Sequence, residues 1–298
     1  MYETIFLNLY NDHEFKKNQQ IPYYNSSAKT AVIVDSRFNP LMESVIRNFM
    51  YFLSPHGWNI CIVSYSGYKS QIKSIFPNCI FKEIDEKYIF FKDNIPNITI
   101  SNYNKIFLDV QFWKELPGEH ILIFQTDCIM YRMFDDYFLE YDYCGANYYN
   151  DQSVFYGGLN GGCSLRKKTT MIECIEHVTC LCKEDISNLY CYKFDALSAL
   201  RKHNRLINPE DYLHGQLSVN SSITDEQCIN EDVFFSHACE LLLKTVPDKI
   251  HRNFFAIEID YNINTCFYHG WNKSYQSIDA ANQIINHSPF LCKYSIAD

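Results

Sequence analysis

The chain has 298 residues and a net charge of −9, and 47% of its residues are hydrophobic and 16% aromatic. This is enough apolar material for a large packed core, which argues against global disorder, while the acidic balance argues against a protein that coats nucleic acid. Residues 1–9 lack a basic start and no apolar run approaches the ~20 residues of a membrane span, so we expect neither a secretory signal nor a membrane span.

Short apolar runs alternate with amphipathic stretches up to residue 124. Residues 1–28 are polar and are predicted to be a lead-in that packs late or not at all. Asn39 is placed to cap a helix that has Pro40 at its first position. The alternation of strands and helices predicts a parallel sheet in an α/β fold. The expected strands cover 31–34, 58–63, 80–84 and 121–124. The expected helices run from Pro40 to near Pro55, over 68–76, and from a Ser101 cap to Pro117.

The second half of the chain has fewer clear elements. Residues 141–146 are expected to form a strand, and a glycine cluster at 157–162 is expected to lead towards a helix from about Lys168. Residues 181–228 show no clean periodicity and are predicted to be a variable, partly helical insertion. A further helix is expected to start at Glu231, because acids are favoured in a first helical turn.

Two distant positions offer ligands for a metal ion. Asp127 follows a buried strand, and a carboxylate at the carboxyl end of a parallel strand points into the crevice where open α/β sheets bind ligands. His269 offers an imidazole, and Gly270 and Lys273 beside it offer a close backbone approach and a cation for a phosphate. Taken singly, each is more simply a surface aspartate or an ordinary hydrogen-bonded histidine.

Three further features have both a functional and a structural interpretation. The glycines around Asn160 could let backbone approach a polar ligand, or form a surface turn. Asp232, beside Glu231, could be a general base, or its negative charge could only stabilise the N-terminus of the helix. The scattered cysteines are expected to be reduced and buried, and the cluster Cys174, Cys180, Cys182 and Cys191 lacks the usual zinc-site spacing.

In combination, these segments resemble a known fold family. Residues 121–127 resemble the strand that ends in the Asp-x-Asp motif of GT-A-fold glycosyltransferases, with Gln125 in place of the first aspartate. The segments 141–146, 160–166 and 231–235 follow in the order seen in those enzymes, and His269 with Lys273 resembles the metal-and-diphosphate segment of glycogenin-like transferases. More narrowly, the chain resembles an uncharacterised family of glycosyltransferase-like domains of giant viruses, fungi and bacteria.

The resemblance implies a fold and an activity. The fold would be a GT-A-like three-layer α/β/α sandwich with a mostly parallel, mixed central sheet. Residues 29–298 would form one catalytic domain, with a nucleotide-binding half at 29–130 and an acceptor-binding half at 131–298. The activity would be transfer of a sugar from a nucleoside-diphosphate donor, by resemblance a UDP-sugar, to a hydroxyl of a glycan, protein or lipid, with inversion.

The resemblance also assigns roles to individual residues. A divalent cation, Mn²⁺ or Mg²⁺, would stabilise the leaving diphosphate as a Lewis acid. Because Gln125 replaces the first aspartate of the motif, the site has one carboxylate fewer, and the ion would bind mostly together with the nucleotide. The implied cation ligands are Asp127 and His269, the donor-binding residues are Gln125, Asn160, Gly161, Gly162 and Lys273, and the base is Asp232. Arg37, at the end of the first strand, and Tyr103, in the helix before Asp127, are further candidates for holding the nucleotide because of their positions in the chain.

Two other functions compete with this one. The missing carboxylate at Gln125 also suits a catalytically inactive module that binds a nucleotide sugar or glycan. The cysteines leave open a zinc or interaction protein. The sequence leaves the sugar, the acceptor and the oligomeric state open, and it predicts no nucleic-acid partner. We expect a cytoplasmic location, or the host cytoplasm or virion if the chain is viral. The high content of Asn, Ile, Lys and Tyr suggests an AT-rich genome, which is compatible with a viral or protist source.

Overall fold

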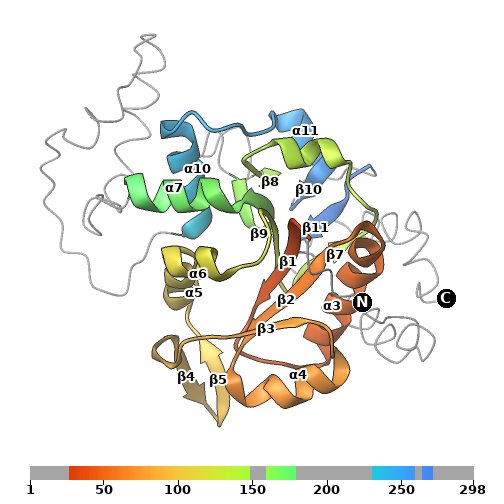
Figure 1. Cartoon of the computed structure of the whole chain (residues 1–298), viewed down its shortest axis with the longest axis vertical. Coiled ribbons are helices and arrows are strands. Elements are labelled where there is room, and N and C mark those ends of the chain that lie inside the picture. Colours follow the sequence, from red (N-terminus) through yellow and green to blue (C-terminus); the bar gives the residue numbers. More distant parts are fainter. Residues whose placement is uncertain (1–26, 148–158, 179–229, 259–263, 271–298) are drawn as a thin grey trace, which may run out of the picture.

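The core of the fold is one six-stranded sheet (Figure 1). The computed structural model describes residues 27–147, 159–178, 230–258 and 264–270, and all structural statements refer to these. In spatial order the strands are β3 (Ile80–Glu83), β2 (Asn59–Ser64), β1 (Lys29–Val34), β6 (His120–Phe124), β9 (Leu159–Lys167) and β8 (Tyr143–Asn147).

The directions of the strands bring distant segments to one edge of the sheet. β3, β2, β1 and β6 are parallel, whereas β9 is antiparallel to both of its neighbours. The amino end of β9 therefore lies beside the carboxyl end of β6, where Phe124 pairs with Cys163. This places the glycines of β9 next to the polar residues that follow β6.

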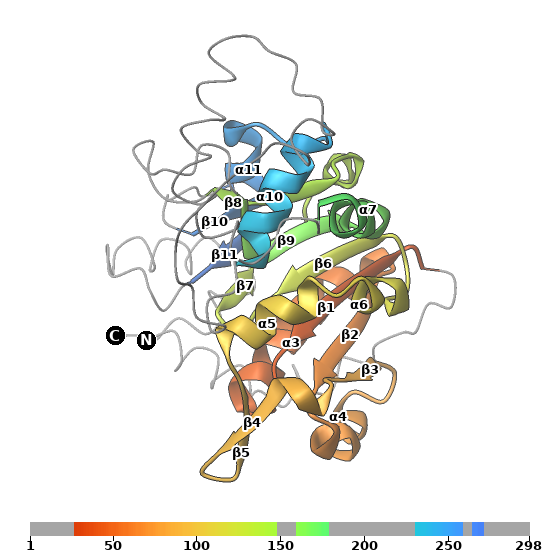
Figure 2. The same ribbon diagram turned by 90° about the vertical axis from the view of Figure 1, so that its left-hand side faces the viewer.

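Helices cover both faces of the sheet, as Figures 1 and 2 show. Ala31 and Ile33 of β1 belong to one hydrophobic core, and Val32 and Val34 belong to the other. This alternation is what a central strand needs when both of its faces are buried. The first core includes α3 (Pro40–Leu53) and α4 (Lys69–Ile75), and the second includes α5 (Ile100–Phe107), α6 (Val110–Glu115), α7 (Lys168–Val178) and α10 (Glu231–Leu241). The predicted three-layer α/β fold with a mostly parallel sheet is thus confirmed.

Helix caps explain one success and one error of the sequence analysis. As predicted, Asn39 caps α3, and its side chain accepts a hydrogen bond from the backbone N–H of Met42 at 2.9 Å. The prediction of a single helix from Ser101 to Pro117 is wrong. The segment forms α5 and α6, capped by Thr99 and Asp109, because Asp109 accepts a hydrogen bond from the backbone N–H of Gln111 and starts a new helix.

The glycines around Asn160 do not form the surface turn that was one of their two interpretations. Gly161 and Gly162 lie within strand β9, which runs directly into α7 at Lys168. A smaller sheet follows, made of β10 (Ala256–Ile257), β11 (Phe267–His269) and β7 (Cys128–Met130), with α11 (Lys249–Phe255) leading into it. None of these three short strands was predicted from the sequence.

A hairpin projects from the body of the molecule, as Figure 2 shows. It pairs β4 (Ile89–Lys92) with β5 (Ile95–Ile98). Its two turn residues, Asp93 and Asn94, have φ angles of 52° and 62°, which suits a two-residue hairpin turn. The sequence analysis missed this hairpin.

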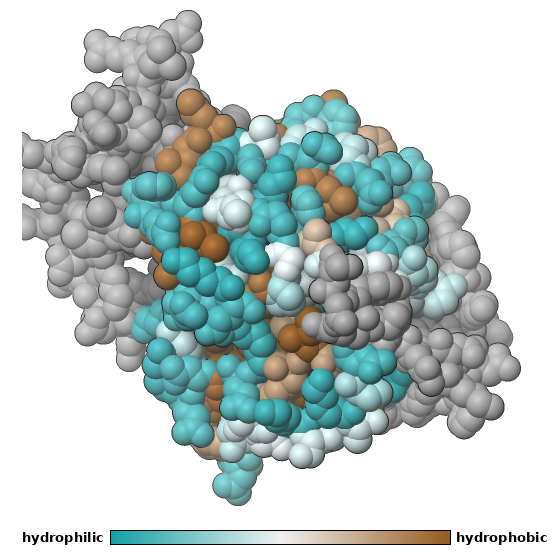
Figure 3. Space-filling model, in the orientation of Figure 1, coloured by the Kyte–Doolittle hydropathy of each residue, from teal (hydrophilic) through white to brown (hydrophobic). Residues whose placement is uncertain are grey.

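The visible surface is largely polar. Figure 3 shows a mainly hydrophilic face with hydrophobic side chains in small separate patches. Within the described ranges, no helix has the length and apolar character needed to cross a bilayer. Most of the lead-in predicted for residues 1–28 and the whole insertion predicted for 181–228 lie outside the described residues, so these boundaries and the division into two halves stay predictions.

Candidate functional site

A polar cavity of about 450 Å³ opens at the carboxyl edge of the sheet. Its size falls in the range of small-molecule sites, and several elements that are far apart in sequence contribute to it. The lining residues include Asp35 and Arg37 after β1, Thr99, Ile100 and Tyr103 of the α5 region, Gln125–Asp127 after β6, Asn160 and Gly162 of β9, Glu231 and Asp232 of α10, and His269 of β11.

The two predicted cation ligands lie together in this cavity. β7 and β11 pair antiparallel with Cys128 opposite His269, so the residue before Cys128 reaches the same place. The backbone N–H of Gly270 donates to the carbonyl of Asp127 at 2.9 Å and fixes the two segments. As a result, His269 Nε2 lies 3.5 Å from Asp127 Oδ1, and the imidazole is buried.

The side chain of Gln125 is held towards the same histidine. Its Nε2 donates a hydrogen bond to the hydroxyl of Tyr103 at 2.9 Å, which leaves Oε1 at 3.2 Å from His269 Nε2. Burial raises the pKa of Tyr103, so its phenol stays protonated. Gln125 therefore presents a neutral oxygen where the Asp-x-Asp motif would present a carboxylate.

The thiol of Cys128 lies close to these groups but is already engaged. Among the described residues, Asp127, Cys128 and His269 have potential ligand atoms within 4.8 Å of one another. The Cys128 thiol donates to the carbonyl of Gly162 at 3.0 Å, and burial raises its pKa well above the usual value. Because thiols bind metals as thiolates, the potential cation donors here are the carboxylate of Asp127, the imidazole of His269 and the amide oxygen of Gln125. This set suits a hard cation such as Mn²⁺ better than a thiolate zinc site.

The cysteine cluster singled out as a rival zinc site is only partly described. Cys180, Cys182 and Cys191 lie outside the described residues. Cys174 is buried, and its sulfur lies 3.9 Å from that of Cys239. All cysteines of the described ranges are free and buried, as expected for reduced thiols.

The glycine-rich start of β9 packs directly on the histidine. A Cβ at Gly162 would lie 2.0 Å from His269 Nε2 and 2.5 Å from its Cε1, so only glycine leaves room for the ring. Asn160 accepts a hydrogen bond from the backbone N–H of Gly162 at 2.8 Å and donates one to Glu258 Oε2 at 2.8 Å. Glu258, which directly follows the two-residue strand β10, was not predicted as a site residue from the sequence.

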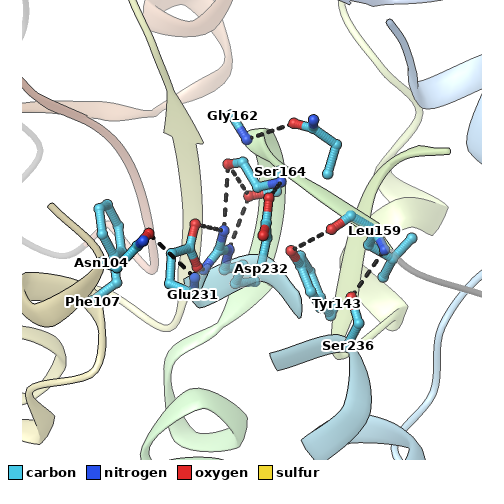
Figure 4. A network of polar contacts seen from close by, with 12 residues as sticks. Asn104, Phe107, Tyr143, Leu159, Gly162, Ser164, Glu231, Asp232 and Ser236 are labelled. Carbon is cyan, nitrogen blue, oxygen red and sulfur yellow. Dashed lines mark hydrogen bonds and ion pairs between the residues drawn. The ribbon is translucent and has the colours of Figure 1, made fainter. Parts of the chain in front are cut away.

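A buried ion pair fixes the start of α10, where Figure 4 shows Glu231 and Asp232 beside Ser164 of β9. Arg166 of β9 is fully buried and donates to Glu231 at 2.5 and 2.9 Å. Burial raises the pKa of Glu231, although Arg166 opposes this shift. The guanidinium of Arg166 lies 4.9–5.8 Å from the ring centres of Phe107, Trp113, Tyr143 and Phe235. The sequence analysis did not predict this pair.

The predicted base lies beside the pair. Asp232 lines the cavity, and its Oδ2 accepts a hydrogen bond from the backbone N–H of Gly161 at 3.0 Å. A Cβ at Gly161 would lie 2.3 Å from Glu231 Oε1, so glycine is also needed here for space. This geometry is compatible with a base at Asp232, and that role stays a prediction.

The remaining predicted donor-binding residues have different positions. Arg37 lines the cavity with a half-exposed side chain, and its hydrogen bond to Asp35 raises its pKa. Lys273 lies outside the described residues. The structure therefore gathers every predicted site residue that it describes around one cavity or its glycine-rich wall, while their roles stay predictions.

Solved structures that are similar to this chain include two glycosyltransferases. The apo form of GlyE from Streptococcus pneumoniae TIGR4 is 11% identical with a TM-score of 0.44, and the match covers 91% of this chain but 61% of GlyE. Apo mouse xyloside xylosyltransferase 1 is 13% identical with a TM-score of 0.43, and the match covers 84% of this chain and 99% of that one. A second GlyE structure is 12% identical with a TM-score of 0.40. Likeness at this level carries no conclusion about substrate or activity.

The family assignment comes from the sequence. No curated protein matches the chain. Residues 85–270, more than half of the chain, match a family model described as "Protein of unknown function (DUF5672)". This stretch includes Asp127 after β6, Asn160 of β9, Asp232 of α10 and His269 of β11. The chain therefore belongs to this family of unknown function.

Proposed function

We propose that this chain is a divalent-cation-dependent glycosyltransferase that moves a sugar from a nucleoside-diphosphate donor, by resemblance a UDP-sugar, to a hydroxyl acceptor. The observation that carries the proposal is the meeting of Asp127 and His269, 3.5 Å apart, in a cavity that Asp232 also lines. A nitrogen and two oxygens converge there, with the amide of Gln125 as the third donor. Such a group attracts a cation, and a cation in turn attracts a diphosphate.

The residues around the cavity would have separate tasks in the proposed transfer. Asp127 and His269 would hold Mn²⁺ or Mg²⁺, which supplies Lewis-acid stabilisation for the charge on the leaving diphosphate. Arg37 and Tyr103 would hold the nucleotide, and the β9 segment at 160–162 would line the sugar side. Asp232 would take the proton of the acceptor hydroxyl.

The proposed reaction is a single displacement at the anomeric carbon. The bond between that carbon and the diphosphate oxygen breaks, and its electron pair stays on the diphosphate. The acceptor oxygen bonds the same carbon from the opposite face and loses its proton to Asp232. The product would have inverted configuration.

Loss of the Asp127 carboxylate tests the cation site. We expect UDP or a UDP-sugar with Mn²⁺ to stabilise the wild-type protein against thermal unfolding, by ~2.7 kcal/mol when the ligand is at 100 times its Kd. Asp127→Ala should lose the Mn²⁺-dependent part of this shift. The exposed Asp136 is not among the residues that line the cavity, so Asp136→Ala is a matched control that should behave as wild type. An unaltered Mn²⁺-dependent shift in Asp127→Ala would remove the central assignment.

Loss of the Asp232 charge tests the base. Asp232→Asn keeps an oxygen for the backbone N–H of Gly161 but cannot take a proton. We expect UDP release from the donor to fall by about 10²–10⁴-fold, while donor affinity measured by calorimetry changes little. Full turnover by Asp232→Asn would refute the base and would favour a retaining mechanism. Donor binding without any turnover, even in the wild type, would instead identify the chain as a nucleotide-sugar-binding module.

A further inference from the structure

The imidazole of His269 lies between acidic groups on both of its nitrogens. Nε2 faces Asp127 Oδ1 at 3.5 Å, and Nδ1 faces Glu258 Oε1 at 3.6 Å. The ring is 3% exposed, and Nδ1 is a buried nitrogen that makes no hydrogen bond within the described part of the chain. A buried polar atom without a partner is costly, so its orientation towards a carboxylate calls for an explanation.

The position of the single ring proton decides what this arrangement can bind. With the proton on Nε2, the lone pair of Nδ1 would face the carboxylate of Glu258, and the proton would point at the oxygens of Gln125 and Asp127. With the proton on Nδ1, that N–H is directed at Glu258, and the Nε2 lone pair faces the same two oxygens. Three lone-pair donors then face one another, an arrangement that a cation satisfies.

The carboxylate of Glu258 is itself oriented by β9. The backbone N–H of Gly162 donates to Asn160 Oδ1, which turns the amide nitrogen of Asn160 towards Glu258 Oε2 at 2.8 Å. β10 and β11 pair in parallel, with Ile257 opposite Tyr268, so the residues that follow each of these, Glu258 and His269, are neighbours. Oε2 of Glu258 therefore accepts a hydrogen bond from Asn160, and Oε1 faces the imidazole at 3.6 Å.

We infer that Glu258 is a positioning residue of the cation site, which holds His269 with its proton on Nδ1 and leaves Nε2 free to bind a divalent cation. The inference rests on the proposed function in one respect, namely that a cation binds between Asp127 and His269. Carboxylates that hold ligand histidines in this way typically change metal affinity 10–100-fold when removed. Glu258 would act through His269 and would not touch the donor.

Glu258→Gln gives a sharp test because the hydrogen bond from Asn160 determines the orientation of the glutamine amide group. The Asn160 amide nitrogen needs an acceptor, so the carbonyl oxygen of the glutamine takes that place and its NH₂ group faces Nδ1 of His269. An NH₂ group donates a hydrogen bond, so Nδ1 must then carry a lone pair and the ring proton moves to Nε2. The substitution should therefore exchange the two tautomers without changing the size of the side chain.

The tautomer can be measured in the cation-free protein by NMR with ¹⁵N-labelled histidine at about pH 8.5, where an ordinary histidine is neutral. The chain has 10 histidines, and the signal of His269 is identified by its loss in His269→Gln. We expect an Nδ1–H tautomer in the wild type, an Nε2–H tautomer in Glu258→Gln, and a return to Nδ1–H in Glu258→Asp. A proton on Nε2 in the wild type, in a neutral ring or in an imidazolium, would overturn the inference.

Mn²⁺ binding in the presence of UDP, followed by electron paramagnetic resonance, gives the second measurement. Affinity should fall about 10–100-fold in Glu258→Gln and recover largely in Glu258→Asp. Glu176→Gln, at an exposed ion pair with Lys114, is the matched control and should bind as wild type. Unchanged Mn²⁺ affinity in Glu258→Gln would overturn the inference. If the wild type binds no Mn²⁺ with UDP, the proposed function fails, whereas the tautomer still decides the role of Glu258.

Discussion

Replacing Gly162 with alanine will abolish cation-dependent nucleotide binding, although the residue changed carries no functional group. The new methyl carbon would lie 2.0 Å from His269 Nε2, far inside any permitted contact, so the imidazole must leave its position. Gly162 lies in strand β9, and its φ angle is not among the positive ones, so alanine strains no backbone there and the effect comes from space alone. Overpacking of this kind costs about 1–3 kcal/mol of stability.

Removal of the His269 imidazole, with which the new methyl group would clash, provides the control for this prediction. In a His269→Ala background the imidazole is absent, so Gly162→Ala should cost much less stability in urea unfolding than it does in the wild type. Mn²⁺-dependent UDP binding, measured by calorimetry, should be lost in both single variants and in the double variant. If Gly162→Ala binds UDP and Mn²⁺ as the wild type does, the imidazole has no part in the cation site or is not packed on β9.

Breaking the buried ion pair between Arg166 and Glu231 should cause the largest loss of stability. Arg166→Met leaves the carboxylate of Glu231, which is 3% exposed, buried without its partner. Removing one member of a buried pair costs about 3–5 kcal/mol, which for a domain of this size lowers Tm by roughly 10 °C. The start of α10 would also lose its anchor, so Asp232 would be misplaced and donor turnover would fall.

A double substitution separates the effect of the unpaired charge on stability from the effect of lost packing. Arg166→Met combined with Glu231→Leu removes both charges from a pocket already lined by aromatic rings, and it should recover much of the lost Tm, because apolar replacements of buried pairs are often neutral. Lys114→Met, at an exposed pair, should change stability by less than about 0.5 kcal/mol. Equal melting temperatures for Arg166→Met and Lys114→Met in calorimetry would contradict the prediction.

The parts of the fold predicted correctly are those whose signals are local and strong. The strand at 121–124 is a fully apolar run, and Asn39 with Pro40 is a clear helix start. The helix break at Asp109 was missed because the apolar spacing of Ile106, Val110 and Trp113 continues through it, whereas the cap that ends the pattern is a single side chain. Local periodicity thus predicts the face of a helix better than its ends.

Residues of the candidate site were predictable only where a motif surrounds them. Asp127 and His269 stand in segments with a recognisable order, whereas Glu258 follows a strand of two residues that no periodicity can reveal. β9 was not recognised as a strand because Gly161 and Gly162 weaken β-propensity, yet close packing against Glu231 and His269 requires glycine there. Arg166 was missed because a buried arginine has no distinct pattern in a sequence.

The position of β11 in the chain has a consequence for biosynthesis. All six strands of the main sheet lie within residues 29–167, but His269 and its strand are translated much later. A nascent chain on the ribosome can therefore pair the strands of its main sheet before it contains both of the proposed cation ligands. Metal capture would then follow translation of the C-terminal part, so an incompletely synthesised chain could not sequester the ion or its nucleotide.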